Sequence, residues 1–223
     1  MKLFLFILTL SVSAAQMTAQ EARVKEMLKT NDTIVWVGLD YSLMRMIGNS
    51  NSIRVPDLLL QDMPAKWNDL FLDERIENVA RALKTRIAVD LEAVTSKNKK
   101  LSTDQVVLGG DSKKAVNESH ITPEEIAKQV RSYKLRNTKG VAAVFIIDRF
   151  VYALIPAQTD GRSTMPAHTQ HYGAVHVVFF DVATREVISK RREVRDVGTG
   201  GSFRNFWFGP IKDIDADIGR YRP

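Results

Sequence analysis

The run Val141-Ala142-Ala143-Val144-Phe145-Ile146-Ile147-Asp148 decides the fold of this chain. Its seven consecutive apolar residues leave no polar face, which is typical of a strand buried on both sides at the centre of a sheet. The β-branched and aromatic side chains favour a strand over a helix. The pattern continues to Ile155, with a bend predicted at Asp148-Arg149.

Further strands are predicted on both sides of this central one. Residues 33–39 are rich in β-branched and aromatic side chains and predict a strand that ends at Asp40. Residues 174–182 and 187–194 are apolar runs joined by a short turn, so they predict a β-hairpin. A short strand is predicted at 106–108.

Helices are predicted where apolar residues recur at helical spacing. One is expected over about 65–84, opened by Pro64, because proline suits the first turn of a helix. Thr122-Pro123-Glu124-Glu125 offers a capping hydroxyl, a proline and two acidic residues, which together predict a helix start. A short helix at 21–29 and a final one over 203–218 complete the set.

Other segments have ambiguous patterns. Residues 86–94 fit both the alternation of a strand and the stripe of a helix, and we favour a strand. A short helical turn is predicted from Tyr41 to Ile47, and loops are predicted at 95–104 and 156–171.

Together these elements predict an α/β (α+β) fold with a single domain. It has a mixed central sheet of about five strands with a C-terminal β-hairpin, packed by three or four helices. The 223 residues, 44% of them hydrophobic, suffice to bury a sizeable core. No internal repeat or long linker divides the chain, so the domain is expected over residues 20–223.

The first residues have the order of a secretory signal peptide. Lys2 precedes the apolar run 3–10, which is followed by small residues up to Ala15. This apolar run is shorter than the about 20 residues needed to span a bilayer. Residues 1–19 are therefore expected to be a signal peptide, cleaved near 14–20, which leaves a periplasmic or secreted protein without a transmembrane segment.

Composition narrows the function classes further. The chain has no cysteine, which excludes disulfides, thiolate metal sites and cysteine nucleophiles. It lacks the Gly-x-Ser-x-Gly motif of α/β hydrolases. The net charge of +6 favours anionic partners. Since an exported protein rarely meets nucleic acid, the expected partner is an envelope protein or an anionic wall or lipid component.

Three predicted strands end in a carboxylate, at Asp40, Asp148 and Asp181. Because the carboxyl ends of parallel strands meet at one rim of a sheet, these oxygens could hold Mg²⁺ and support metal-assisted hydrolysis. The alternative is structural, since aspartate also caps turns. Antiparallel pairing of the strands that carry Asp148 and Asp181 would separate these two side chains.

His168, His171 and His176 follow the pattern His-x-x-His-x-x-x-x-His. Three neutral imidazoles could bind zinc, but this spacing matches no common zinc motif. His176 also lies inside a predicted strand, so we favour a loop pair and one packed histidine, and expect no cofactor. Asp40, Asp148, His168 and His171 are the candidate metal ligands.

Two segments are the best candidates for contact with a ligand or partner. Four aromatics in the six residues 203–208 exceed what one helical face can bury, so Arg204, Asn205, Phe206 and Trp207 are candidate contacts. Asp40, Tyr41 and Arg45 form the second group. A basic cluster on the hairpin (Lys190, Arg191, Arg192, Arg195) either meets an anionic polymer or blocks an edge strand.

The segments 37–42, 45–48, 67–68 and 203–207 together resemble a group of uncharacterised secreted proteins of Gram-negative bacteria. The resemblance spans most of the mature chain and implies export, but this group has no assigned activity to carry over. In strand–helix order the chain also resembles the curli-secretion lipoprotein and the activators of penicillin-binding proteins. Those proteins are lipidated, whereas this chain has no cysteine to carry a lipid.

These observations predict an exported cell-envelope protein that acts non-enzymatically, through a protein partner or an anionic ligand. Two alternatives stay open. One is a metal-dependent hydrolase that uses Asp40 and Asp148 with one or more histidines. The other is a structural subunit of a homo-oligomer.

Overall fold

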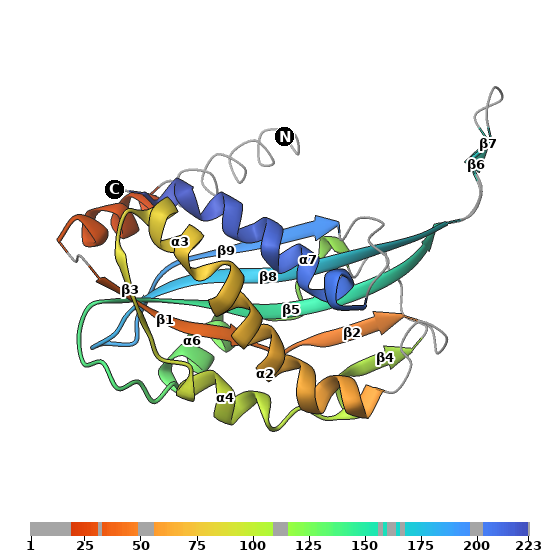
Figure 1. Cartoon of the computed structure of the whole chain (residues 1–223), viewed down its shortest axis with the longest axis horizontal. Helices are drawn as coiled ribbons and strands as arrows, with labels where there is room; N and C mark the ends of the chain where they lie inside the picture. The colour runs from red at the N-terminus through yellow and green to blue at the C-terminus, as the bar shows by residue number, and fades with distance from the viewer. Residues whose placement is uncertain are drawn as a thin grey trace, which may run out of the picture.

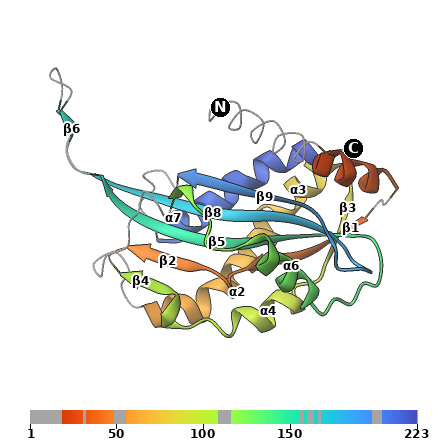
Figure 2. The same ribbon diagram turned by 180° about the vertical axis from the view of Figure 1, so that it is seen from behind.

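The apolar run that begins at Val141 forms β5 (Val141–Ile155), the central strand of a seven-stranded sheet. The computed structural model describes residues 19–30, 33–48, 56–108, 116–155, 158–159, 164–165, 168–196 and 203–222 (Figures 1 and 2). The predicted α/β class and the single domain are confirmed.

The other strands of the sheet lie on either side of β5. On one side, β8 (His168–Asp181) pairs antiparallel with β5, and β9 (Val187–Asp196) pairs antiparallel with β8. On the other side, β1 (Thr33–Asp40) and β2 (Arg45–Gly48) lie one after the other along the same edge of β5, both parallel to it.

Two short parallel strands complete the sheet. β3 (Arg86–Val89) pairs with β1, and β4 (Val106–Leu108) pairs with β2. A separate small ladder joins β6 (Gln158–Thr159) and β7 (Thr164–Met165) beyond the ends of β5 and β8. The sheet is therefore mixed, as predicted.

Helices cover both faces of this sheet (Figures 1 and 2). One face carries α2 (Pro56–Glu74), α3 (Ile76–Leu83) and α7 (Phe203–Ala216), with the 3₁₀ helix η2 (Asp217–Tyr221). The opposite face carries α6 (Pro123–Arg131) and the buried side of α4 (Glu92–Asn98). Residues 19–30 are also helical, and Val24 and Leu28 join the core of the α2 face.

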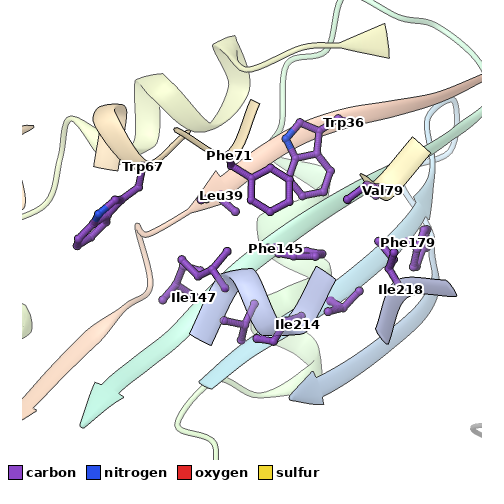
Figure 3. Close-up of a cluster of buried hydrophobic side chains, with 14 of the residues drawn as sticks. Trp36, Leu39, Trp67, Phe71, Val79, Phe145, Ile147, Phe179, Ile214 and Ile218 are labelled. Carbon is purple, nitrogen blue, oxygen red and sulfur yellow. The ribbon is translucent and has the colours of Figure 1, made fainter. Parts of the chain in front are cut away.

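The larger core lies between β5 and the helices α2, α3 and α7 (Figure 3). Trp36 stacks on Phe71 with ring centroids 4.7 Å apart, and Phe145 meets the edge of both rings. Close approach of α7 to the sheet depends on Gly173, because a Cβ there would lie 2.4 Å from the Cβ of Pro210. These contacts fix the helices against the strands that carry the candidate site.

Several predicted elements are confirmed. The strand at 33–39, the strand at 106–108 and the hairpin at 174–194 are present. The bend predicted at Asp148-Arg149 is a β-bulge, where the register with β8 shifts between Ile147 and Arg149. Thr122 caps α6, with the Thr122 and Glu125 side chains each bonded to the other's backbone N–H.

Other predictions were wrong in detail. The sheet has seven strands rather than about five, and more helices pack on it than the three or four expected. The stretch 41–47, predicted as a helical turn, contains β2, because pairing with β5 and β4 outweighs its local pattern. The helix predicted over 65–84 is divided at Arg75 into α2 and α3, and it begins at Pro56 rather than near Pro64.

The ambiguous segments also have definite structures. Residues 86–89 form the predicted strand β3, but 92–98 form α4, which replaces the first half of the loop expected at 95–104. Within the loop predicted at 156–171, β8 already begins at His168, and β6 and β7 form a small ladder.

The predicted signal peptide lies outside the described residues except for residue 19. Among the helices that are described, none is long and apolar enough to cross a membrane.

Candidate functional site

The break between β1 and β2 places Asp40 and Asp148 at the same part of the sheet. Asp40 ends β1 opposite Ile146, and Arg45 begins β2 opposite Arg149, so the bulged Asp148 lies beside the gap between the two strands. Asp181 pairs with Val141 at the other end of β5, because β5 and β8 are antiparallel. The alternative in which this pairing separates Asp181 from Asp148 is therefore correct.

The carboxylate of Asp40 is buried and accepts four hydrogen bonds. Its Oδ1 accepts from the backbone N–H of Ser42 at 2.9 Å and from the Ser42 hydroxyl at 2.6 Å. Its Oδ2 accepts from Gln129 Nε2 and from the Tyr133 hydroxyl, both at 2.6 Å. Burial raises the pKa of Tyr133 well above its ordinary value, and the Asp40 charge raises it further. Asp40 therefore joins the strand break to α6.

Amide side chains hold the chain that leaves β1. Asn68 accepts from the N–H of Leu39 at 2.7 Å and donates to its carbonyl, and Asn98 accepts from the N–H of Tyr41 at 2.8 Å. Gln105 donates to the carbonyls of Ser42 and Met44. Tyr41 itself is fully buried against Trp67, so this predicted contact residue lies in the core.

Asp148 is the centre of a buried cluster of charged and polar groups. Its Oδ1 lies 2.6 Å from Nδ1 of His120 and 3.2 Å from Nε of Arg149. Its Oδ2 lies 2.6 Å from Nε of Arg192 and 3.9 Å from Nε2 of His176. One fully buried carboxylate is thus surrounded by two guanidinium groups and two imidazoles.

The same cluster fastens the segment 116–121 to the sheet. Arg192 donates to the carbonyls of Val116 and Glu118, and the Ser119 hydroxyl lies 3.0 Å from Nε2 of His176. Nε2 of His120 lies 2.8 Å from the carbonyl oxygen of Leu43. His120 thereby links the turn after β1 to Asp148.

The order of contacts in this cluster differs from that of a catalytic serine triad. In a triad, the histidine uses one nitrogen for the nucleophile and the other for the carboxylate. Here Ser119 and Asp148 both lie nearest Nε2 of His176, at 3.0 and 3.9 Å. The geometry therefore supports a fastening role for these groups, because Asp148 does not orient His176 from the other ring nitrogen as a triad requires.

Burial and charge shift the titration of this cluster in opposite ways. Burial raises the pKa of Asp148, but hydrogen bonds from His120 and Arg192 and the charges of Arg149 and Arg192 outweigh it and hold that pKa well below its usual value. Burial lowers the pKa of His176 to about 4, against the attraction of Asp148. The positive charges of Arg192, Lys190 and His120 lower the pKa of His176 further.

We expect His176 to make the protein less stable as the pH falls from about 6.5 to 4. The unfolded chain takes up a proton on this residue near the ordinary histidine pKa of about 6.5, whereas the folded chain takes it up only near pH 4. The resulting loss is on the order of 3 kcal/mol at the acid end. Measured by urea unfolding, His176→Gln is expected to have a shallower decline over this range; an unchanged slope would contradict the assignment.

A small open cavity lies next to the cluster. Its volume is about 250 Å³, and it is lined by residues 42–45, 104, 105, 120, 121 and 125. Arg45, one of the predicted contact residues, is exposed and belongs to this lining. The walls therefore combine one guanidinium group with the carboxylates of Asp104 and Glu125.

The far end of β5 and β8 forms a second distinctive feature, which we call the arm: Tyr152–Ile155 of β5 paired with His168–His171 of β8. β2 pairs with β5 only as far as Val151, and β9 pairs with β8 only from Tyr172. Within the described chain, no third strand pairs with the arm. Figures 1 and 2 show it projecting from the body of the molecule, with β6 beyond it.

The remaining predicted site residues are dispersed. His168 and His171 both lie in the arm on β8, whereas Asp148 lies beside residues 174–175 of that strand. Burial lowers the pKa of His171 to about 4. The backbone of residues 204–207 belongs to α7, but the side chains of Arg204, Asn205, Phe206 and Trp207 lie outside the described part of the chain. In that described part, no three His, Asp or Glu side chains are grouped to hold a metal ion.

The basic cluster on β9 is neutralised by acidic residues of the same chain. Glu193 forms ion pairs with Arg191, Arg195 and Arg220. Asp217 pairs with Arg195 and Arg220 as well, and Arg192 pairs with Asp148. The positive charges of the hairpin are therefore largely used within the fold.

Sequence reasoning missed His120 and Arg149 as members of the Asp148 cluster. An available signal was the charged pair Asp148-Arg149 within an otherwise apolar strand, because a buried charge needs a partner. His120 had no comparable signal, since it lies outside any regular element and reaches Asp148 only through the fold.

Comparison with known proteins finds similarity among solved structures. No protein-family model matches the chain, and no curated protein matches it. Among solved structures, a hypothetical protein from Chlamydia trachomatis is similar, with 12% identity over 85% of this chain and 92% of that chain, at a TM-score of 0.31. A TM-score this low supports no inference about function.

Proposed function

We propose that this protein is exported and acts in the cell envelope without catalysis, by binding a protein partner through the arm. The observation that carries this proposal is the arm itself, a two-stranded ribbon that continues beyond β2 and β9. An isolated two-stranded hairpin is at best marginally stable in water. A ribbon extended away from the body is better explained if a further strand adds to it.

The charges on the strand edges support the same conclusion. Proteins usually protect edge strands from unwanted pairing with charged side chains. β9, an edge of the main sheet, carries the charged run from Lys190 to Glu193. The eight residues of the arm include no Asp, Glu, Lys or Arg. The arm therefore lacks the protection that β9 has, which favours pairing with an extended segment of a partner.

A protein partner fits the charge distribution better than an anionic polymer does. The basic residues of β9 form ion pairs with Glu193, Asp217 and Asp148, so a polymer would have to compete with these carboxylates.

The hydrolase alternative needs metal ligands at Asp40 and Asp148. Both of these carboxylates already accept hydrogen bonds from several groups of their own chain.

Site-specific photo-crosslinking in the native host tests the arm. A crosslinking residue at Ala153 or Gln170 is expected to give a discrete adduct with one envelope protein. The same residue at Glu77, exposed on α3, serves as the matched position and is expected to give none. Adducts consisting of two copies of this chain would support the homo-oligomer instead, and the absence of arm-specific adducts would overturn the proposal.

Export is tested separately by fractionating the host cells and sequencing the N-terminus of the protein. The signal-peptide pattern predicts that the protein is recovered outside the cytosol and begins between about residues 15 and 21. Recovery from the cytosol with Met1 or Lys2 at its start would contradict export, whatever the arm binds.

A further inference from the structure

The cavity beside the Asp148 cluster holds opposite charges that do not neutralise one another. The guanidinium group of Arg45 lines it together with the carboxylates of Asp104 and Glu125. Among the described residues, Arg45 forms no ion pair with either carboxylate. The walls therefore present separated positive and negative groups.

Each of these groups has bonding capacity left over. Glu125 uses Oε2 to accept from the N–H of Thr122 at 2.7 Å, and Asp104 uses Oδ2 to accept from the Ser102 hydroxyl at 3.2 Å. The second oxygen of each carboxylate makes no hydrogen bond to the described residues. His120 and Gln105 are fully used in holding Leu43, Asp148 and the turn 42–44, so they form a fixed wall.

The charge pattern selects one kind of ligand. A simple anion would be attracted by Arg45 but repelled by the two carboxylates. A simple cation would be attracted by the carboxylates but repelled by Arg45. A molecule that carries both a carboxylate and an ammonium group satisfies both ends, and charge-assisted hydrogen bonds are the strong ones in protein sites. Ile121 and Leu43 also line the cavity and offer apolar surface to a ligand side chain.

The size of the cavity limits the ligand further. Its volume of about 250 Å³ is below the roughly 300–1,000 Å³ of sites for drug-sized molecules. We propose that this cavity binds a small zwitterion, a free amino acid or a dipeptide, with its carboxylate on Arg45 and its ammonium group between Asp104 and Glu125. This site is separate from the arm and its existence does not depend on the partner proposed there.

Titration of the purified protein, followed by NMR chemical shifts, tests this site. The probes are leucine and alanyl-leucine, together with their N-acetyl and C-terminal amide derivatives, which each lack one charge. At least one zwitterion is expected to bind with shifts at residues 42–45 and 120–125. Removing either charge from that ligand is expected to weaken binding about tenfold or more, which corresponds to about 1.4 kcal/mol.

Variants of the protein separate this site from unspecific binding. Arg45→Gln and Glu125→Gln are each expected to weaken the same zwitterion about tenfold. Glutamine at 125 retains the capping hydrogen bond to Thr122, so α6 stays intact. Arg131→Gln removes one positive charge, as Arg45→Gln does, but from an exposed position of α6. It is expected to leave binding unchanged. Equal binding of the blocked derivatives, equal binding by the Arg45 variant, or no binding of either zwitterion at millimolar concentrations would overturn the proposal.

Discussion

Gly38→Ala is expected to lower the free energy of unfolding by several kcal/mol. Gly38 has a φ of +113°, which residues with a side chain rarely adopt, and it lies at the register shift between β1 and β5. A Cβ here would lie 2.6 Å from Oδ1 of Asn68, 2.7 Å from Leu91 and 2.9 Å from Val94. Backbone strain and overpacking each cost about 1–3 kcal/mol, so the sum is roughly 2–6 kcal/mol.

Denaturant unfolding of purified protein measures this effect, and Gly219→Ala is the matched control. Among the described residues, a Cβ at Gly219 would meet only the Cβ of Ala82, at 3.9 Å, which is an ordinary contact. This control is expected to change stability by less than about 1 kcal/mol. Similar losses in both variants would show that the crowding at Gly38 is not the cause.

The central part of the fold could be predicted because it depends on strong local patterns. The apolar run of β5 is long and continuous, and the capping sequence of α6 satisfies the first N–H groups of its own helix. β2 could not be predicted in the same way. Its four residues, Arg45–Gly48, become a strand only because β5 and β4 supply partners that are distant in sequence.

The site could be predicted only in part, for a similar reason. Asp40 ends β1 as predicted, whereas Asp148, also predicted as a strand end, lies within β5 at its bulge. The parallel pairing of β1 and β2 with β5 brings both side chains to one break in the sheet. Their roles depend on side chains from elsewhere. Tyr133 reaches Asp40 from just beyond the end of α6, and Arg192 reaches Asp148 from β9, across 93 and 44 residues of sequence.

The arm shows the opposite case, in which the sequence pattern was present but its meaning was not apparent. The apolar pattern continues through Tyr152 to Ile155, and the strand was predicted to extend that far. The length of the partner strand was underestimated, because residues 168–173 (His, Thr, Gln, His, Tyr and Gly) include no aliphatic side chain. Pairing with β5 compensates for this weak local preference.

Asp148→Asn is expected to lower the free energy of unfolding by about 3–5 kcal/mol at neutral pH. The side chain keeps its size, so the change removes the charge with little effect on packing. It leaves Arg149, only 7% exposed, and Arg192, 17% exposed, without the carboxylate that compensates their buried charges. Breaking a buried ion pair from one side is costly because the remaining charge has lost its partner but not regained water.

The pH dependence of this variant provides a second, independent test. Because the Asp148 pKa is held well below its usual value, its carboxylate contributes stability fully above the unfolded pKa of about 3.9, and this contribution is lost as the pH falls below that value. The difference between the wild-type protein and Asp148→Asn, measured by denaturant unfolding, is therefore expected to be constant from pH 8 to about 5 and to shrink in acid.

Asp69→Asn removes the same charge from the exposed surface of α2 and controls for the change in net charge. It is expected to alter stability by no more than about 0.5 kcal/mol, since surface substitutions away from special contacts are usually small in effect. If Asp148→Asn were as mild as this control, the cluster around Asp148 would not be what holds segment 116–121 against the sheet. The fastening role of His120, His176 and Arg192 would then have to be abandoned with it.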